Sequence, residues 1–467
     1  MGGECLVGTP ESIPENCLQQ AYNFEYGGEV LQPQVVPGVT IKLDLESEAT
    51  AGFYDSVHDC FLVESGQNLY KIATDFSTKT YLGTLTGTYA PVFCMYDTFC
   101  LLATGGQIQK FDGTTLSILD NSPLSHHVST CFGRLRAYNI NSDIINYSAI
   151  GDPTNWTNNP SDISSGQYIK IGYKDAGLIT ASMMLSQDFI VFKSSGIPYR
   201  IMSENDFNNV RIVTAANKVF AYNHYCGLTV GNRAYFAGHD GIQSISTVTD
   251  YGGVKVDEPA PGLLINPWFI LNATERARIW NIPYKRQLWV KGQDDKIVWI
   301  YHYNVLANGV SGSWTHRDFV YQIKDVMLKD DKTYVLYGNK IGLLDNTTSL
   351  DDGNKFTAQL VSRRYIPNLK KFIVNHFNFM GFNMLDGDAV LSIATKQYPF
   401  SFTRTDSDIF GDTTDIFDDF TTIVSDDFSQ IRKNLQKRIN YLECRLIVNS
   451  GRMAIHSLNV DISEVNF

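Results

Sequence analysis

The chain has 467 residues, of which 38 are Lys or Arg and 49 are Asp or Glu, so its formal net charge is −11. Hydrophobic residues make up 43% and charged residues 19%, a composition too apolar and too weakly charged for intrinsic disorder. The acidic balance argues against a protein that grips nucleic acid by neutralising phosphates, because such binding needs a basic surface. It does not exclude a protein that DNA passes by.

The composition favours sheet over helix. The chain contains 27 Phe, 25 Tyr, 6 Trp and 36 Gly, and aromatic residues separated by glycine turns are typical of strands. We therefore predict an all-β protein. The eight cysteines form no CxxC pair, so we expect reduced, mostly buried thiols rather than a zinc site. No apolar stretch is long enough for a membrane span, and we expect no membrane insertion.

Residues 1–40 are predicted to form an extended N-terminal arm. This stretch contains polar loops and four prolines, and it ends in the Val-Pro-Gly-Val segment at 36–39. We expect the arm to pack on the domain that follows rather than to form a domain of its own.

The segment 41–354 repeats one pattern seven times: an apolar strand, a turn that often contains glycine, and a second apolar strand. Turn pairs such as Ser65-Gly66 and Asp240-Gly241 supply the positive φ angles that tight hairpins require. Equivalent positions in the seven hairpins are Phe61, Phe99, Leu135, Phe189, Tyr235, Leu288 and Tyr334. Their spacing runs from 36 to 54 residues, which brackets the roughly 40–50 residues of a four-stranded propeller blade. We predict a β-propeller with six or seven blades, and the alternative is a series of sandwiches with coincidental hairpins.

The hairpin spacing stops near residue 355. The segments 372–382, 389–396, 439–448 and 453–462 then show the alternation of apolar and polar residues that is typical of strands. We predict a C-terminal β-sandwich-like domain over 355–467, with an acidic insertion at 406–427.

The insertion is the candidate site of the sequence. Its aspartates are Asp406, Asp408, Asp412, Asp415, Asp418, Asp419, Asp426 and Asp427. A calcium loop needs oxygen ligands at fixed spacing and a closing carboxylate, and here no carboxylate closes the loop in that register. We expect a solvated acidic loop that lines a channel or contacts another subunit; calcium binding is the alternative.

The sequence indicates no catalytic site, cofactor or metal. It lacks the zincin motif, the nucleophile elbow, the phosphate-binding loop, the dinucleotide fingerprint and the aspartate box of sialidases. Adjacent His126 and His127 point to opposite faces of a strand, so they make a poor joint metal site. Trp156, Trp268 and Trp314 are able to stack on sugars if exposed, so a glycan-binding or glycan-cleaving propeller is the alternative function.

Three segments carry a resemblance to a known family. The first is GRLRAYNINSDIINYSAIGDPTNWT (133–157), which leads through two strands to a Gly-Asp-Pro-x-x-Trp loop; the others are the Val-Pro-Gly-Val segment and the closing strand pair 436–462. Taken in order, they resemble the packaged-DNA stabilisation, or tail hub, proteins of P22-like short-tailed phages. They resemble the tail nozzle proteins of T7-like phages more loosely. The acidic insertion has no counterpart in this pattern.

The resemblance implies a structural virion protein with no enzymatic activity. It implies a homo-oligomer, most often a hexameric ring, assembled in the host cytoplasm and mounted in the phage tail below the portal and adaptor. Such a ring continues the DNA channel, helps to retain packaged DNA, and offers a platform for tail fibres or a needle. An acidic lumen repels the DNA backbone, so we expect DNA to pass through without specific binding.

Overall fold

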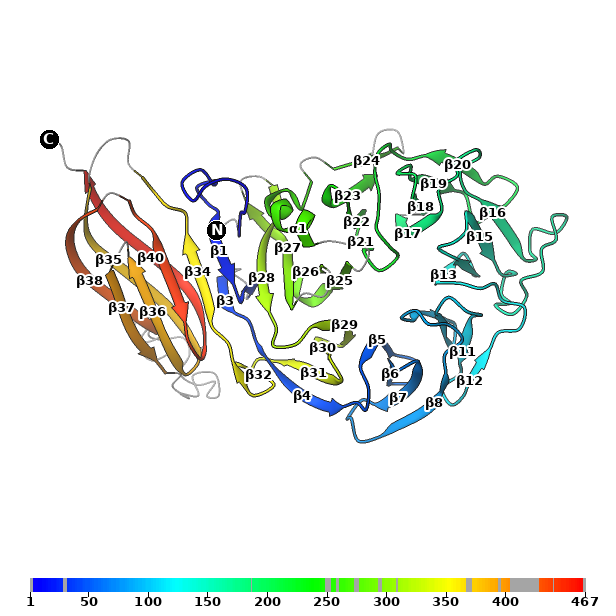
Figure 1. Ribbon diagram of the computed structural model, residues 1–467, viewed down its shortest axis with the longest axis horizontal. Coiled ribbons are helices and arrows are strands. Elements are labelled where there is room, and N and C mark those ends of the chain that lie inside the picture. Colours follow the sequence, from blue (N-terminus) through cyan, green and yellow to red (C-terminus); the bar gives the residue numbers. More distant parts are fainter. Residues whose placement is uncertain are drawn as a thin grey trace, which may run out of the picture.

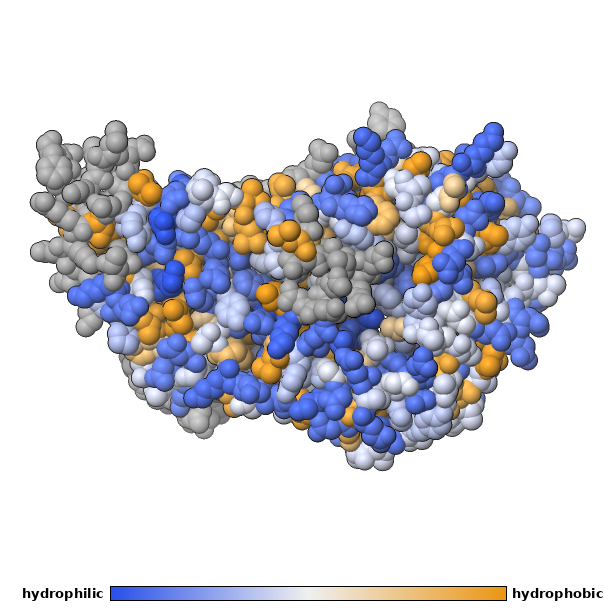
Figure 2. Space-filling view, in the orientation of Figure 1, coloured by the Kyte–Doolittle hydropathy of each residue, from blue (hydrophilic) through white to orange (hydrophobic). Residues whose placement is uncertain are grey.

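The computed structural model describes residues 3–27, 32–185, 187–247, 253–257, 260–272, 277–292, 296–307, 310–366, 372–393, 396–403, 428–439 and 441–464. Within these residues the chain is almost entirely β-structure, which confirms the predicted all-β class. Figure 1 shows two parts: sheets arranged around a central axis, and a sandwich at one end of the long axis. On the face drawn in Figure 2, hydrophobic residues lie in small groups among hydrophilic ones.

Seven four-stranded antiparallel units form the ring within the described ranges, so the propeller has seven blades. Blade 1 consists of β5 (Ala49–Asp55), β6 (Cys60–Ser65), β7 (Asn68–Ala73) and β8 (Lys79–Thr84). Blade 2 consists of β9 (Val92–Tyr96), β10 (Phe99–Ala103), β11 (Gln109–Phe111) and β12 (Leu116–Ile118). Blade 3 consists of β13 (His127–Cys131), β14 (Arg134–Tyr138), β15 (Ile144–Tyr147) and β16 (Gln167–Lys170).

The ring continues through blades 4 to 6. Blade 4 consists of β17 (Ile179–Leu185), β18 (Asp188–Lys193), β19 (Tyr199–Met202) and β20 (Arg211–Thr214). Blade 5 consists of β21 (Gly227–Val230), β22 (Arg233–Gly238), β23 (Gly241–Thr247) and β24 (Val254–Val256), and is followed by η1 (Leu263–Ile265) and α1 (Asn266–Asn272). Blade 6 consists of β25 (Arg278–Ile282), β26 (Gln287–Lys291), β27 (Ile297–Ala307) and β28 (Val310–Asp318), with η2 (Pro283–Lys285) between its first two strands.

Blade 7 closes the ring with a strand from the other end of the chain. Its own strands are β29 (Ile323–Lys329), β30 (Lys332–Tyr337) and β31 (Lys340–Asp345), and its fourth strand is β4 (Gly38–Asp44). β4 pairs antiparallel with β31, with Leu344 opposite Val39. The sheet continues into β32 (Leu350–Asp351) and β33 (Asn354–Lys355). Because β4 precedes blade 1 in the chain, this pairing ties the last blade to the first.

The propeller core lies between the blades. Each of the seven positions equated in the sequence falls on the second strand of its blade, and these strands are buried along nearly their whole length. Phe61 of blade 1, for example, packs with Tyr334 and Leu336 of blade 7. The turn after β6 places Gly66 at φ +59° and Gln67 at φ +65°, the two positive angles of a tight hairpin turn. A strand buried on both faces reads as a continuous apolar run, which is why the hairpins could be recognised in the sequence.

The second part of the molecule is a sandwich of two sheets. One sheet runs in the order β1 (Leu18–Tyr22), β34 (Ala358–Ser362), β39 (Cys444–Val448), β36 (Gly387–Ile393) and β37 (Lys396–Phe402). The other runs in the order β2 (Phe24–Gly27), β3 (Gln32–Val35), β40 (Arg452–Glu464), β35 (Phe372–Leu385) and β38 (Phe428–Ile439). Their facing apolar residues form one core, as the predicted sandwich-like domain requires.

The N-terminal residues differ from the extended arm that we predicted over 1–40. Strands β1, β2 and β3 belong to the two sandwich sheets, and Phe24 and Val35 are buried in the sandwich core. β1 also pairs in parallel with β28 of blade 6, with Tyr22 opposite His316. A single nine-stranded sheet therefore runs from blade 6 into the sandwich. β2 and β3 pair with each other, but β1 and β3 gave no sign of their other partners, because β28, β34 and β40 lie more than 290 residues away in the chain.

Candidate functional site

The acidic insertion lies outside the described residues. Its aspartates, Asp406, Asp408, Asp412, Asp415, Asp418, Asp419, Asp426 and Asp427, all fall in the range 404–427 that the structure leaves undescribed. The predicted channel or interface loop, and the alternative of calcium binding, stay predictions.

The described part of the sandwich contains a cavity of about 630 Å³ between its two sheets. Leu360, Leu391 and Leu446 line it from one sheet. Phe379, Ile455 and Leu458 line it from the other. The cavity falls in the size range of sites that take ligands or partner side chains, about 300–1,000 Å³. The side chains that line an empty apolar cavity lack the dispersion contacts that neighbouring atoms would give them, so filling the cavity with apolar atoms is favourable.

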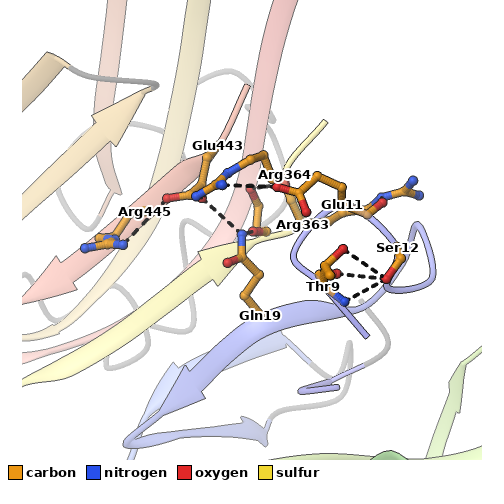
Figure 3. Close-up of polar contacts among 9 residues, drawn as sticks. Thr9, Glu11, Ser12, Gln19, Arg363, Arg364, Glu443 and Arg445 are labelled. Carbon is orange, nitrogen blue, oxygen red and sulfur yellow. Dashed lines mark hydrogen bonds and ion pairs between the residues drawn. The ribbon is translucent and has the colours of Figure 1, made fainter. Parts of the chain in front are cut away.

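Charged residues that adjoin the cavity-lining Arg363 and Cys444 in the sequence form a network that Figure 3 shows. Arg364 donates from Nη1 to Glu11 Oε1 at 3.1 Å and from Nη2 to Glu443 Oε2 at 3.0 Å. Gln19 donates to Glu443 Oε2 at 3.2 Å, and Arg445 Nη2 lies 3.6 Å from Glu443 Oε1. The hydrogen bond with Glu443 raises the pKa of Arg364 above its ordinary value. Glu443 thus contacts two arginines. Through Glu11, Arg364 and Glu443 the network links the N-terminal loop to the segment after β34 and to the residue before β39.

Apolar side chains extend outward from the mouth. Tyr365, which lines the cavity, is 46% exposed, and its neighbour Ile366 is 51% exposed. Arg363 stands between the cavity and the N-terminal loop, donating from Nε to the Glu11 carbonyl oxygen at 3.2 Å. An apolar pocket within a polar, charge-paired rim is the anatomy of a protein–protein contact site.

The propeller axis is bridged at the end where the first strands of the blades begin. The Tyr225 hydroxyl, just before blade 5, donates to the carbonyl oxygen of Ala90, just before blade 2. Arg278 of blade 6 donates to the carbonyl oxygens of Thr50 at 3.1 Å and Lys324 at 2.7 Å. Its guanidinium also lies 4.4 Å from the centre of the Tyr225 ring. Because these contacts cross the axis, the centre of the propeller is not open to a DNA duplex.

His127, one of the two adjacent histidines considered in the sequence, lies near His224, whose ring packs on Tyr225 of this bridge. The rings of His127 and His224 lie 6.1 Å apart, centre to centre. Burial lowers the pKa of His127 to about 3 and holds that of His224 well below its ordinary value. These imidazoles are therefore neutral at pH 7. In the described ranges, no group of three or more His, Cys, Asp or Glu residues is arranged to hold a metal ion.

The three tryptophans considered for sugar stacking have structural positions. Trp314 is fully buried and donates from its indole to the Pro261 carbonyl oxygen at 2.8 Å. Trp268 packs against Trp299 with ring centres 5.4 Å apart. Trp156 packs on the core between blades 2 and 3. Trp314 in particular is unable to meet a sugar from solvent.

The eight cysteines are free thiols, and six of them are buried. Across the described residues, no helix is both long enough and apolar enough to cross a membrane.

Sequence reasoning missed the sandwich cavity. The adjacent arginines Arg363 and Arg364 are a local signal, but their partner Glu443 lies some 80 residues further along the chain. The apolar lining comes from six separate strands and the N-terminal loop, and no local pattern brings those segments together.

The fold defines a seven-bladed β-propeller protein with a fused β-sandwich. No protein-family model matches the chain. A search of curated protein sequences also found no match.

Solved structures show only a distant likeness. The extracellular domain of the putative one-component system BT4673 from B. thetaiotaomicron matches with 8% identity and a TM-score of 0.44, over 92% of this chain and 62% of that one. U3-55K matches with 9% identity and a TM-score of 0.43, over 66% of this chain and 99% of that one. PorZ of Porphyromonas gingivalis matches with 10% identity and a TM-score of 0.40, over 78% of this chain and 46% of that one, so the chain spans about half of its length. The assignment of the fold rests on the strand pairing of the chain itself.

Proposed function

We propose that this chain is a non-enzymatic structural subunit of a phage virion, a tail hub or nozzle protein. In this proposal the subunits assemble in the host cytoplasm into a ring, most often of six copies, below the portal and adaptor of the tail. The ring continues the DNA channel, helps to retain packaged DNA, and carries fibres or a needle.

The observation that carries the proposal is the rigid connection between propeller and sandwich. A closed ring of identical subunits requires two surfaces held at a fixed angle within each subunit. Here β1 is hydrogen-bonded both to blade 6 and to the sandwich sheet. Two polar contacts between blade 6 and the N-terminal residues lie at the junction: Glu25–Lys285 at 3.0 Å, and Glu4 with the His316 ring at 2.7 Å. Bending the two parts against each other would break these contacts and take the buried Glu25 away from its counter-charge Lys285, which is costly away from water.

The segment that carries the family resemblance also has a defined structure, which supports the proposal. Residues 133–157 form β14, β15 and the start of the loop that joins β15 to β16. Arg134 of that segment is buried and donates to the carbonyl oxygens of Ser148, Ile163 and Ser165. The segment 133–157 thus leads into a surface loop whose backbone carbonyl groups accept hydrogen bonds from the buried Arg134.

The net charge of −11 supports passage of DNA rather than binding. An acidic protein raises the free energy of a phosphate backbone near its surface, so a duplex does not adhere to the wall of the channel.

Imaging and DNA binding test the proposal together. Mass photometry and negative-stain microscopy of the purified full-length chain are expected to show closed rings as the concentration rises. A gel-shift assay with duplex DNA at low salt is expected to show no complex. A chain that stays monomeric up to about 100 μM, alone and with an adaptor, would contradict the proposal, and so would tight binding to duplex DNA. Binding or hydrolysis of polysaccharide by such a monomer would favour the glycan alternative.

A further inference from the structure

The loop 148–166 of blade 3 presents apolar side chains to solvent. Ile150 is 51% exposed and Ile163 is exposed as well, and so is Phe132 in the neighbouring turn between β13 and β14. The amide of Ile150 donates to the Ser164 carbonyl oxygen at 2.9 Å. The amide of Gly151 donates to the carbonyl oxygen of Gly133, the residue after Phe132, at 2.8 Å. These bonds hold the three apolar side chains near one another. We call Phe132, Ile150 and Ile163 the blade 3 knob.

The loop that carries the knob is held in one conformation. Arg134 binds three of its carbonyl oxygens, and Trp156 anchors it to the core between blades 2 and 3. The carboxylates of Asp152 and Asp162 accept hydrogen bonds from the amides two residues further on. A loop that is already ordered loses little entropy when a partner binds it. The structure of the loop thus favours a role in recognition.

The sandwich offers the complementary feature. Its cavity of about 630 Å³ is lined mostly by apolar side chains and by the exposed Tyr365, and Ile366, the next residue, is exposed as well. We infer that this cavity receives the blade 3 knob of a second copy of the chain. The inference rests on the proposed function, since it names the surfaces by which the ring would close.

The placement of the two features favours a second copy as the occupant. Figure 1 shows the sandwich at one end of the long axis and the loop between β15 and β16 at the other. A knob and a pocket at opposite ends of a rigid subunit make a head-to-tail contact, and such a contact closes into a ring when the rotation per subunit allows it. In such a ring the sandwich of each copy contacts blade 3 of the next copy.

The charges of the two surfaces do not oppose this contact. The loop 148–166 contains Asp152 and Asp162 and no Lys or Arg. Hydrogen bonds from Thr154 and Ser164 lower the pKa of these two carboxyl groups, so both are ionised at neutral pH. Arg363 lines the pocket, and Arg364 and Arg445 belong to the neighbouring network; each of the three is paired with a glutamate, so their charges are balanced. Rim charges of this kind set orientation and association rate more than affinity.

Two variants of the full-length chain test the inference, one at each surface. The knob variant combines Ile150→Asp and Ile163→Asp, and the pocket variant is Leu442→Trp, which places an indole at the mouth of the cavity that Leu442 lines. The matched control is Ile118→Asp, which puts the same charge at a 47% exposed position on β12 of blade 2. Thermal unfolding followed by circular dichroism checks that each variant is folded. We expect each surface variant to raise the concentration for half-assembly at least tenfold and the control to leave it unchanged.

Mixing the two variants gives a sharper result. Each variant keeps one intact surface, so an equimolar mixture is able to form one knob-in-pocket contact and no second one. Mass photometry should then show dimers in the mixture and monomers of each variant alone. Rings that persist in both variants would overturn the inference and leave the proposed ring standing. A wild-type chain that never forms rings would overturn the proposed function itself, so the two failures are distinguishable.

Discussion

Replacing Asp351 by Asn removes the charge that faces Arg317 and keeps the size of the side chain. Asp351 lies on β32, against the ring-closing strand β4, and Arg317 lies on β28 of blade 6. Both side chains are buried, and the guanidinium lies 2.8 Å from the carboxylate and 4.0 Å from the centre of the Phe319 ring. The variant therefore leaves a buried guanidinium without its counter-charge.

The expected cost is about 3–5 kcal/mol of unfolding free energy, the cost typical of breaking a buried ion pair from one side. Burial raises the pKa of Asp351 above its ordinary value even though Arg317 lowers it. Desolvation thus outweighs the attraction between the two charges. The double variant Arg317→Met with Asp351→Leu removes both charges, and we expect it to lose less than about 1 kcal/mol relative to wild type.

Urea unfolding followed by tryptophan fluorescence measures both variants against the wild-type chain. The single variant should unfold at clearly lower urea and melt several degrees lower, while the double variant stays close to wild type. A single variant that costs less than about 1 kcal/mol, or a double variant that costs as much as the single one, would refute the reasoning about desolvation between blade 6 and the blade 7 sheet.

Three further predictions concern stability. Burial lowers the pKa of His302 to about 3, so the unfolded chain binds a proton at this residue more tightly than the folded chain does. The free energy of unfolding should therefore fall as the pH drops below about 6.5, and this residue should account for about 2 kcal/mol of the loss at pH 5. Urea unfolding of the His302→Gln variant should show a weaker dependence of stability on pH. A Cβ at Gly342 would lie 2.3 Å from Val39 Cγ1, so Gly342→Ala should speed hydrogen exchange in β4, whereas Gly253→Ala, with open space around it, should not. Tyr225→Phe removes the hydroxyl that bridges the axis and should cost about 0.5–1.5 kcal/mol in thermal unfolding; an unchanged Tm would contradict that role.

The propeller could be predicted because its signal is local. In each blade the second strand is buried on both faces, so it reads as a short apolar run followed by a turn, as in Cys60–Ser65 and Gln287–Lys291. The seven runs gave the blade spacing, although the insertions near blades 3 and 5 left six or seven blades open. The strand pairing resolves the number because it shows β4 as the fourth strand of blade 7.

The pairing of distant strands could not be predicted from the same patterns. Val39 and Leu344 are partners in the ring closure, and Tyr22 and His316 are partners at the junction. A strand sequence states which face is apolar but not which strand lies beside it. The extended arm was the wrong interpretation for this reason. The sandwich cavity escaped prediction in the same way, because its lining is assembled only when the N-terminal and C-terminal strands meet.

The central claim is that copies of this chain form a closed ring around a channel. Two-dimensional class averages of the purified full-length chain, imaged in negative stain at the concentration where mass photometry shows assembly, test it most directly. We expect rings with an open centre, in which the sandwich of each subunit contacts blade 3 of the next. Particles that remain single propellers with a protruding sandwich at every concentration would contradict it.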